Sequence, residues 1–274
     1  MSVRPKKRLG QHFLTDPGVV RQIVDAVGAP PGAPVVEIGP GEGVLTDSLR
    51  RRHPDLVALE VDPEAVAHLR ARFPTLDVRE ADVLEVDWRA LREERGTRHE
   101  DGEAETTGQQ PAPLHVVGNL PYYITSPILF GLLEARAHIE RAVVMVQKEV
   151  ADRLASPPGS KVYGTLSVYF QLFARTTLLM DVPRHAFRPP PAVESAVVVV
   201  DLAGVTPPDV AWPALQAVVR AAFGQRRKML RNSLGVLEAQ TGRPVPDWAA
   251  TRRPEAVSPD DFVALAHHFF DPSA

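Results

Sequence analysis

The chain has 274 residues, no cysteine and a formal net charge of −3. A chain without cysteine forms no disulfides or thiolate metal sites, and no apolar run approaches the roughly 18 residues that a membrane helix needs. Hydrophobic residues make up 44% of the chain, which is enough for a sizeable core. We therefore expect a soluble cytoplasmic protein with one large and one small domain and no metal site.

Charge is distributed unevenly along the chain, so that the small net charge hides two basic clusters. Residues 1–8 and 220–231 carry four and five cations, respectively, and no acid. Residues 92–105 have the opposite character, with six acids against three arginines. The two basic clusters are candidates for contact with nucleic-acid phosphates.

Residues 16–146 alternate between short apolar runs and stretches with helical periodicity. The pattern predicts strands at 35–38, 56–61, 76–79, 114–117 and 142–146, and helices at 16–27, 44–51, 63–73 and 126–134. The first helix has Asp16 as its cap and Pro17 in its first position. Late strands are predicted at 178–182 and 196–201, as a terminal hairpin pair. This order is typical of an α/β fold, a Rossmann-like, mostly parallel sheet with helices on both faces.

The C-terminal part is predicted to be helical. Residues 203–209 contain Pro207 and Pro208 and are interpreted as a linker, followed by helices at 212–223, 228–240 and 259–270. We therefore expect an α/β domain over residues 1–202 and a small helical domain over residues 203–274. Residues 93–113 lack apolar periodicity and are interpreted as a flexible acidic insertion in the first domain.

A glycine-rich turn follows the first strand of the predicted sheet. Gly39, Gly41 and Gly43 are spaced as G-x-G-x-G, unlike the G-x-G-x-x-G of dinucleotide sites, which disfavours a nicotinamide-dependent oxidoreductase. The spacing is similar to the first motif of class I methyltransferases, whose cofactor is S-adenosyl-L-methionine. Glu60, after the second strand, is expected to bind ribose hydroxyls, and Asp82, after the third, to accept from the adenine amino group. Each residue alone also fits a tight turn, a strand end or a helix cap.

The sequence Asn119-Leu120-Pro121-Tyr122 follows the fourth strand and fits chemistry on an exocyclic amine. The lone pair of such an amine is delocalised into the ring, so the amine is a poor nucleophile. The Asn119 side-chain oxygen and the Leu120 carbonyl can accept hydrogen bonds that favour its pyramidal, attacking form. Pro121 stiffens the loop, and Tyr122 can stack on an extruded base. The four residues also fit an ordinary turn after a strand.

Seven stretches, spread over nearly the whole chain, resemble the ribosomal RNA adenine N6,N6-dimethyltransferases. They are Leu9–Leu14, Glu37–Gly43, Asn119–Phe130, Gln147–Val150, Lys161–Val168, Phe187–Ser195 and Phe223–Lys228. Within that family, residues 122–127 and 223–228 resemble the housekeeping small-subunit (16S) rRNA branch. The antibiotic-resistance branch, which acts on large-subunit rRNA, usually departs from those two stretches.

The resemblance implies S-adenosyl-L-methionine-dependent dimethylation of two adjacent adenosines in a hairpin near the 3′ end of small-subunit rRNA. The partner would be the assembling small ribosomal subunit, with a role in ribosome biogenesis, and we expect a monomer. His12 and Leu14 would line the methionine side of the cofactor, although the family more often has Asn at position 12. Phe187 would sandwich the target base opposite Tyr122.

RNA binding is expected at the second basic cluster. Arg226, Arg227, Lys228 and Arg231 are expected to contact phosphates, with residues 6–8 as a second contact, whereas a solvated helix face is the alternative. Two other functions stay open: large-subunit rRNA adenine dimethylation, and a non-catalytic assembly or transcription factor on the same fold. The intact loop from Asn119 to Tyr122 argues against a loss of activity.

Overall fold

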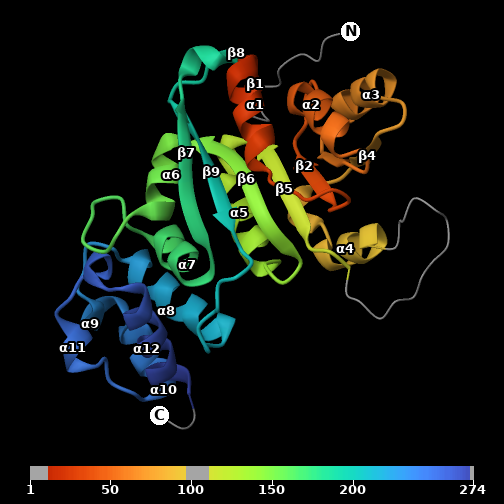
Figure 1. The fold of residues 1–274 in the computed structure, drawn as a ribbon. Helices are drawn as coiled ribbons and strands as arrows, with labels where there is room; N and C mark the ends of the chain where they lie inside the picture. The colour runs from red at the N-terminus through yellow and green to blue at the C-terminus, as the bar shows by residue number, and fades with distance from the viewer. Residues whose placement is uncertain (1–11, 97–110, 272–274) are drawn as a thin grey trace. The chain divides into compact units, whose positions relative to one another are not determined.

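The computed structural model describes residues 12–96 and 111–271, which form two compact units (Figure 1). Unit 1 comprises the chain up to Ala151 together with Thr177–Gly204, and unit 2 comprises Asp152–Thr176 and the chain from Val205 onward. Residues 152–176 therefore group with the C-terminal helices. A boundary between independently folding domains at residue 202 stays a prediction.

Unit 1 is built on a seven-stranded sheet with the strand order β4-β3-β2-β5-β6-β9-β7 (Figure 1). The strands are β2 (Val35–Ile38), β3 (Val57–Glu60), β4 (Asp77–Glu80), β5 (Leu114–Asn119), β6 (Ile139–Gln147), β7 (Arg175–Val182) and β9 (Ser195–Asp201). Strands β4, β3, β2, β5 and β6 are parallel, and β9 is antiparallel to β6. The mostly parallel sheet predicted from the apolar runs is confirmed. Every residue of β2 and β3 is buried, as expected for strands covered on both faces.

Five helices of the described chain belong to unit 1: α1 (Pro17–Ala26), α2 (Val44–Arg52), α3 (Pro63–Arg72), α4 (Trp88–Gly96) and α5 (Thr125–Glu134). Helix α6 (Lys148–Ala155) is divided equally between the two units, whose boundary follows Ala151. The side chain of Asp16 accepts hydrogen bonds from the N–H groups of Gly18 and Val19, which confirms the predicted cap of α1. Ile23 of α1 and Leu49 of α2 are buried in one cluster with core residues of β2, β5 and β6. The first of the two helices is thus held at both its cap and its apolar face.

Unit 2 is helical and has an aromatic core. Its helices are α7 (Thr165–Phe173), α8 (Trp212–Gly224), α9 (Leu230–Ser233), α10 (Gly235–Thr241), α11 (Asp247–Ala250) and α12 (Pro259–Phe270). The ring of Phe223 in α8 lies close to two other aromatic rings. Its centroid is 6.1 Å from that of Tyr163, which precedes α7, and 5.6 Å from that of Phe262 in α12. The Tyr163 hydroxyl donates to the carbonyl of Val257 at 2.9 Å. None of the described helices, in either unit, is long and apolar enough to cross a membrane.

The helix predicted at residues 228–240 is confirmed only in part, because the segment is helical from Leu230 but is broken at Leu234. Lys228 lies in a turn after α8, and the rest of the segment forms α9 and α10, which meet at Leu234 and Gly235. Glycine inside a continuous helix is about 1 kcal/mol less favourable than alanine, so the local preference for one unbroken helix is weak at Gly235. Tertiary packing therefore decides the local conformation. The basic cluster therefore lies on a turn and a short helix, and not along one amphipathic helix.

Helix α4 continues to Gly96, whereas the sequence pattern places the start of an acidic insertion at residue 93. Residues 97–110 lie outside the described part of the chain.

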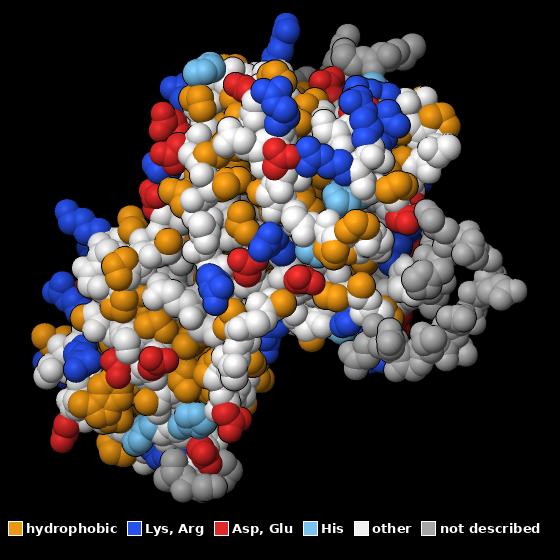
Figure 2. All heavy atoms as spheres, viewed as in Figure 1, with side chains coloured by type: hydrophobic (Ala, Val, Ile, Leu, Met, Phe, Trp, Pro, Cys, Tyr) orange, Lys and Arg blue, Asp and Glu red, His pale blue; other side chains and the backbone are white. Residues whose placement is uncertain are grey.

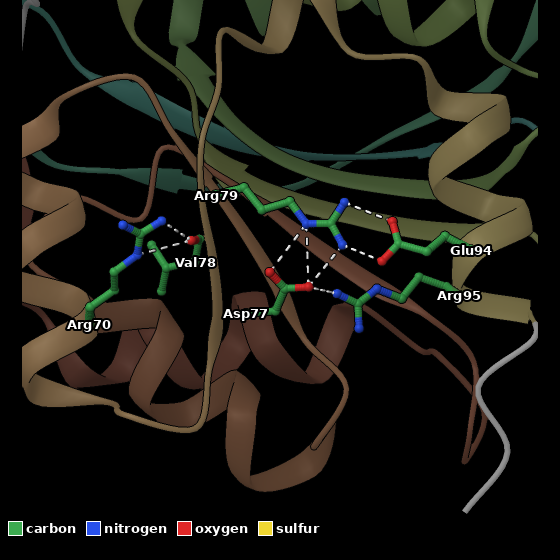
Figure 3. A network of polar contacts seen from close by, with 6 residues as sticks. All are labelled: Arg70, Asp77, Val78, Arg79, Glu94 and Arg95. Atoms are coloured by element: carbon green, nitrogen blue, oxygen red, sulfur yellow. Dashed lines mark hydrogen bonds and ion pairs between the residues drawn. The ribbon is translucent and has the colours of Figure 1, made fainter. Parts of the chain in front are cut away.

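An ion-pair network binds α4 to the edge strand β4 (Figure 3). Asp77 of β4 pairs with both Arg79 and Arg95, and Arg79 also donates to Glu94 at 2.7 Å. The Arg95 side chain is 2% exposed, so Asp77 helps to compensate a buried charge.

Replacing Asp77 with alanine is expected to lower the free energy of unfolding by about 2–4 kcal/mol, because Arg95 would keep a buried charge without this partner. The matched control is Asp47→Ala. Asp47 pairs with Arg50 and Arg51 on the exposed side of α2, where such pairs contribute at most about 1 kcal/mol. Urea unfolding of both variants measures the difference. Equal losses would show that the network in Figure 3 is no more important than a surface pair.

Candidate active site

A pocket lies at the carboxyl ends of β2, β3, β4 and β5, where parallel α/β sheets bind their ligands. It is lined by His12–Leu14, Glu37–Glu42, Val44, Leu45, Leu59–Val61, Ala81–Val83 and Asn119–Ile124. The structure therefore brings together ten of the sequence-predicted site residues: His12, Leu14, Gly39, Gly41, Glu60, Asp82, Asn119, Leu120, Pro121 and Tyr122. They come from five separate parts of the chain, which the sheet topology joins at one edge.

The turn after β2 requires glycine at Gly41. Its φ is +56°, in the left-handed region, and an added Cβ would lie only 2.9 Å from a ring carbon of Phe13. Phe13 belongs to a short strand, β1 (Phe13–Leu14), that crosses the turn. The glycine thus allows the N-terminal segment to approach the pocket closely.

Glu60 fastens the end of β3 to this turn. Its Oε1 accepts from the N–H groups of Val61 and Asp62, both at 2.9 Å, and its Oε2 accepts from the N–H of Gly41 at 3.0 Å. Burial raises the pKa of Glu60, and the three N–H donors oppose that rise. A carboxylate has about four acceptor positions, so about one remains for a ligand hydroxyl. The residue predicted to hold a ribose also shapes the turn.

Residues after β3, β4 and β5 form the more exposed part of the pocket lining. Asp82 is exposed, and its Oδ1 accepts from the N–H of Leu84 at 3.0 Å, which leaves Oδ2 for a ligand. Val61 and Tyr123 are apolar lining residues that are 48% and 54% exposed. Tyr123 is a lining residue for which the sequence predicts no role. A flat ligand entering here would meet apolar side chains and a carboxylate.

Asn119 ends β5 and is oriented by the N-terminal segment. Its Nδ2 donates to the backbone carbonyl of His12 at 3.0 Å. The side-chain oxygen is therefore the atom of this amide that stays available to accept a hydrogen bond. Leu120, the next residue, donates its N–H to the carbonyl of Met145 in β6 at 3.0 Å. Both predicted acceptors thus belong to residues whose backbone the central sheet holds in place.

Tyr122 is half-buried and is held at two points. Its ring stacks on the imidazole of His12, with centroids 5.7 Å apart and an angle of 27° between the planes. Its hydroxyl lies 2.6 Å from Oγ of Ser195. Burial raises the pKa of the phenol, so the hydroxyl is protonated at neutral pH. The aromatic ring predicted to stack on a base is fixed in the pocket wall.

The N-terminal segment is bound to the chain around Phe187. Strand β1 pairs with β8 (Phe187–Arg188), where Leu14 lies opposite Phe187, and His12 Nδ1 lies 2.8 Å from the carbonyl of Pro189. Phe187 is 3% exposed and packs in the core cluster, and it is not among the residues that line the pocket. The structure therefore does not bring Phe187 to the predicted base site, and its stacking role stays a prediction.

Glu37, which precedes the glycine turn in β2, is a pocket residue that the sequence analysis did not assign. It is fully buried, and its Oε2 has no hydrogen-bond partner in the described part of the chain. Burial raises the pKa of Glu37 to about 8, and the nearby Glu60 carboxylate adds to the rise. An acid within a buried apolar strand, directly before a ligand turn, is the sequence signal that could have identified it.

We expect Glu37 to make the free energy of unfolding fall with rising pH. Its pKa is about 8 in the folded chain against an ordinary 4.5, so between these values the unfolded chain has released a proton that the folded chain retains. The slope for one such group is about −1.4 kcal/mol per pH unit. In Glu37→Gln this contribution disappears, so the variant should gain stability relative to the wild type from pH 5 to pH 8. The free energy of unfolding of both proteins is measured at each pH. If it changes with pH in the same way in both proteins over that range, the assignment is contradicted.

No cluster of His, Asp or Glu that could hold a metal ion occurs among residues 12–96 and 111–271. The pocket is instead built from backbone, carboxylates and aromatic rings, and two of its features fit a cationic organic cofactor. One is the orphaned Oε2 of Glu37, and the other is the close passage that Gly41 allows. A positively charged donor beside Glu37 would favour the ionised form of this buried carboxyl, which burial and the nearby Glu60 otherwise keep protonated.

The sheet topology and the position of the pocket assign the chain to the class I methyltransferases. More narrowly, the chain belongs to the ribosomal RNA adenine dimethylase family, whose sequence profile matches residues 3–245. It is therefore a ribosomal RNA methyltransferase, an enzyme that requires a methyl donor.

Similar proteins include the "Ribosomal RNA small subunit methyltransferase A" of Salinibacter ruber, 48% identical over 97% of this chain and 85% of that protein. A protein of the same name from Leptothrix cholodnii is 47% identical over 95% of this chain and 90% of its own. Among solved structures, a dimethyladenosine transferase from Plasmodium falciparum has a TM-score of 0.71 at 23% identity, covering 93% of this chain and 96% of that one. The 23S rRNA methyltransferase ErmE has a TM-score of 0.63 at 25% identity, covering 94% and 99%.

Proposed function

We propose that this chain uses S-adenosyl-L-methionine to dimethylate two adjacent adenosines at N6, in a hairpin near the 3′ end of small-subunit rRNA. The substrate would be the assembling small ribosomal subunit, and the enzyme would act as a monomer. The observation that carries the proposal is the convergence of the Asn119–Tyr122 loop with Glu60 and the glycine turn in one pocket. The names of the relatives from Salinibacter and Leptothrix support the small subunit as the substrate.

The described residues fit this donor and suggest how it would be held. Glu60 would bind ribose hydroxyls with its remaining acceptor position, and Asp82 would accept from the adenine amino group. Glu37 would face the cationic end, and His12 and Leu14 would cover the methionine side. Bound there, the sulfonium group supplies an electrophilic methyl carbon. The chain itself supplies orientation and the exclusion of water.

Methyl transfer would be promoted by hydrogen bonds that form fully only as the amine attacks. The Asn119 side-chain oxygen and the Leu120 carbonyl accept the two N6 hydrogens, which draws the lone pair out of conjugation with the purine. Tyr122 stacks on the extruded base. With N6 held in this way, its lone pair would be placed to accept the methyl group that the bound sulfonium would supply, and the methylated amine would release its proton to solvent. No general base is required before attack, and a second round gives the dimethylated product.

RNA contact is proposed for the basic cluster of unit 2, defined as Arg226, Arg227, Lys228 and Arg231. Arg227, Lys228 and Arg231 are exposed, and Arg226 donates to the carbonyl of Lys161 at 2.6 Å. Within the described part of the chain, none of the four pairs with an acid. Lys and Arg side chains also gather over α2 and α3 (Figure 2), but Arg50 and Arg51 there share an ion pair with Asp47, which reduces their net charge. Residues 6–8, the second predicted contact, lie outside the described residues.

The test is methyl transfer from isotopically labelled S-adenosyl-L-methionine to small subunits isolated from cells that lack this modification. We expect N6,N6-dimethyladenosine, detected by mass spectrometry of digested rRNA and mapped to two adjacent positions. Large subunits form the second arm, because the similarity to ErmE favours large-subunit rRNA as the alternative substrate. Label found only in large-subunit RNA would support that alternative, and label on a base other than adenine would refute both.

A further inference from the structure

Ser195 lies beside the pocket for a topological reason. It is the first residue of β9 and lies opposite Gln147, the last residue of β6. Because β9 is antiparallel to β6, its first residue is placed at the carboxyl edge of the parallel strands, where the pocket lies. The side chain is fully buried, with 0% of the residue exposed. A hydroxyl at this position needs a hydrogen-bond partner, since an unpaired buried hydroxyl is destabilising.

The partner of Ser195 is the hydroxyl of Tyr122, at an O–O distance of 2.6 Å. This distance is at the short end of the usual range for O–H···O hydrogen bonds. Tyr122 has only two side-chain torsions, and two contacts restrict them. His12 stacks on one face of the ring, and Ser195 holds the tip of the ring. The opposite face is therefore presented in a fixed orientation.

We propose that Ser195 is a positioning residue for methyl transfer, which anchors the Tyr122 ring so that the stacked adenine presents N6 to Asn119. This inference rests on the proposed function, because it requires a base stacked on Tyr122. Ser195 itself contacts neither the base nor the donor in this account. Its effect is geometric: the two acceptors for N6 belong to Asn119 and Leu120, whose backbone is held by β5 and β6, and the ring must place the base against them.

The alternative is that Ser195 serves only to start β9, with the Tyr122 contact as a by-product. The two roles predict different couplings. A positioning role operates through the hydroxyl of Tyr122, so removing either hydroxyl should remove the same interaction. A purely structural role would affect folding stability, and its effect on turnover would not depend on the Tyr122 hydroxyl.

The experiment is a double-mutant cycle on the full chain, with Ser195→Ala, Tyr122→Phe and the double variant. Each protein is assayed for kcat and KM on small subunits that lack the modification, and for S-adenosyl-L-methionine affinity by calorimetry. We expect each single variant to lower kcat about 3- to 10-fold, the loss typical of one neutral hydrogen bond. The double variant should be no slower than the slower single variant, and cofactor affinity should stay within about twofold of the wild type.

The matched control is Ser233→Ala, at another buried serine, whose Oγ has no hydrogen-bond partner in the described part of the chain. It should leave kcat unchanged. If Ser195→Ala unfolds in a thermal melt, Ser195→Cys, which keeps a similar volume and a weaker donor, replaces it in the cycle and should lower kcat by a smaller factor.

Three results would overturn the positioning role: full kcat in Ser195→Ala, multiplicative losses in the double variant, or a change confined to cofactor affinity. These results differ from a failure of the proposed function, which would appear as a wild-type protein that methylates no small-subunit adenine. If the wild type instead methylates large-subunit rRNA, the same cycle is run on that substrate and is judged by the same three results.

Discussion

Replacing Asn119 with alanine is expected to lower kcat on the order of 10²-fold while S-adenosyl-L-methionine affinity changes little, because the loss of one preorganised transition-state acceptor has about that effect. Asn119 Nδ2 donates to the His12 carbonyl, so the oxygen of the amide is the atom that remains to accept a hydrogen bond from the substrate. That oxygen accepts its hydrogen bond fully only once the amine becomes pyramidal. Its loss should therefore weaken ground-state binding of the substrate only slightly. The measurements are single-turnover methylation of small subunits and calorimetry with the cofactor.

The comparison for Asn119→Ala is Glu60→Ala, which should show the reverse pattern. Glu60 is 5% exposed and binds the backbone of Gly41, so its loss removes a proposed ribose contact and also loosens the glycine turn. We expect cofactor affinity to fall first, and turnover at saturating cofactor to fall less. An equal loss of cofactor affinity in the two variants would contradict the division of roles between the Asn119 loop and Glu60.

The centre of the sheet was predictable because β2, β3 and β5 are short, largely apolar and buried on both faces. The run Val35–Ile38 is such a strand, and so is Val57–Glu60 within the predicted segment 56–61. Their signal is local, since each strand is bounded by turn residues or a capped helix. Strands β1 and β8 had no such signal. Each has two residues, and Phe13 pairs with Arg188, 175 positions later in the chain. Only the tertiary fold creates that pairing.

Several helices were not predicted, since parts of their sequence resemble buried strands or polar insertions. Thr165–Phe173 in α7 is almost continuously buried, so it lacks the apolar and polar alternation that marks a surface helix. Lys148–Ala155 follows β6 directly, without a turn residue between them. Gly96 ends α4 in a stretch rich in Glu and Arg, whose order depends on the ion pairs with β4 and not on apolar burial alone.

The candidate site was predictable where residue type and position after a strand coincide. Gly41, Glu60 and Asn119 each follow or end a parallel strand, so the topology brings them together without further information. Ser195 could not be found in this way, because its place depends on an antiparallel strand and its role depends on a partner 73 residues away. Phe187 is the reverse case. The family resemblance implied a base-stacking role for it, whereas its side chain packs in the core cluster and not in the pocket lining.

The triple variant Arg226→Ala/Arg227→Ala/Lys228→Ala is expected to weaken binding to small ribosomal subunits about tenfold or more at moderate salt, without a change in cofactor affinity. These side chains lie in unit 2, on the turn between α8 and α9, and none pairs with an acid among the described residues. If each meets one phosphate, the loss of three contacts should flatten the slope of log affinity against log salt by roughly 0.7 to 0.9 per contact.

The control for the basic cluster is Arg50→Ala/Arg51→Ala/Arg52→Ala, which removes the same formal charge from α2. Those three side chains pair with Asp47 and Asp25, so their net contribution to the field that attracts RNA is already reduced. A nonspecific effect of net charge would weaken binding equally in both triple variants. Direct phosphate contact should weaken binding and flatten the salt slope only in the cluster variant. An unchanged slope and affinity in that variant would mean that Arg226, Arg227 and Lys228 are only a solvated turn, and RNA binding by unit 2 would have to be assigned to other residues.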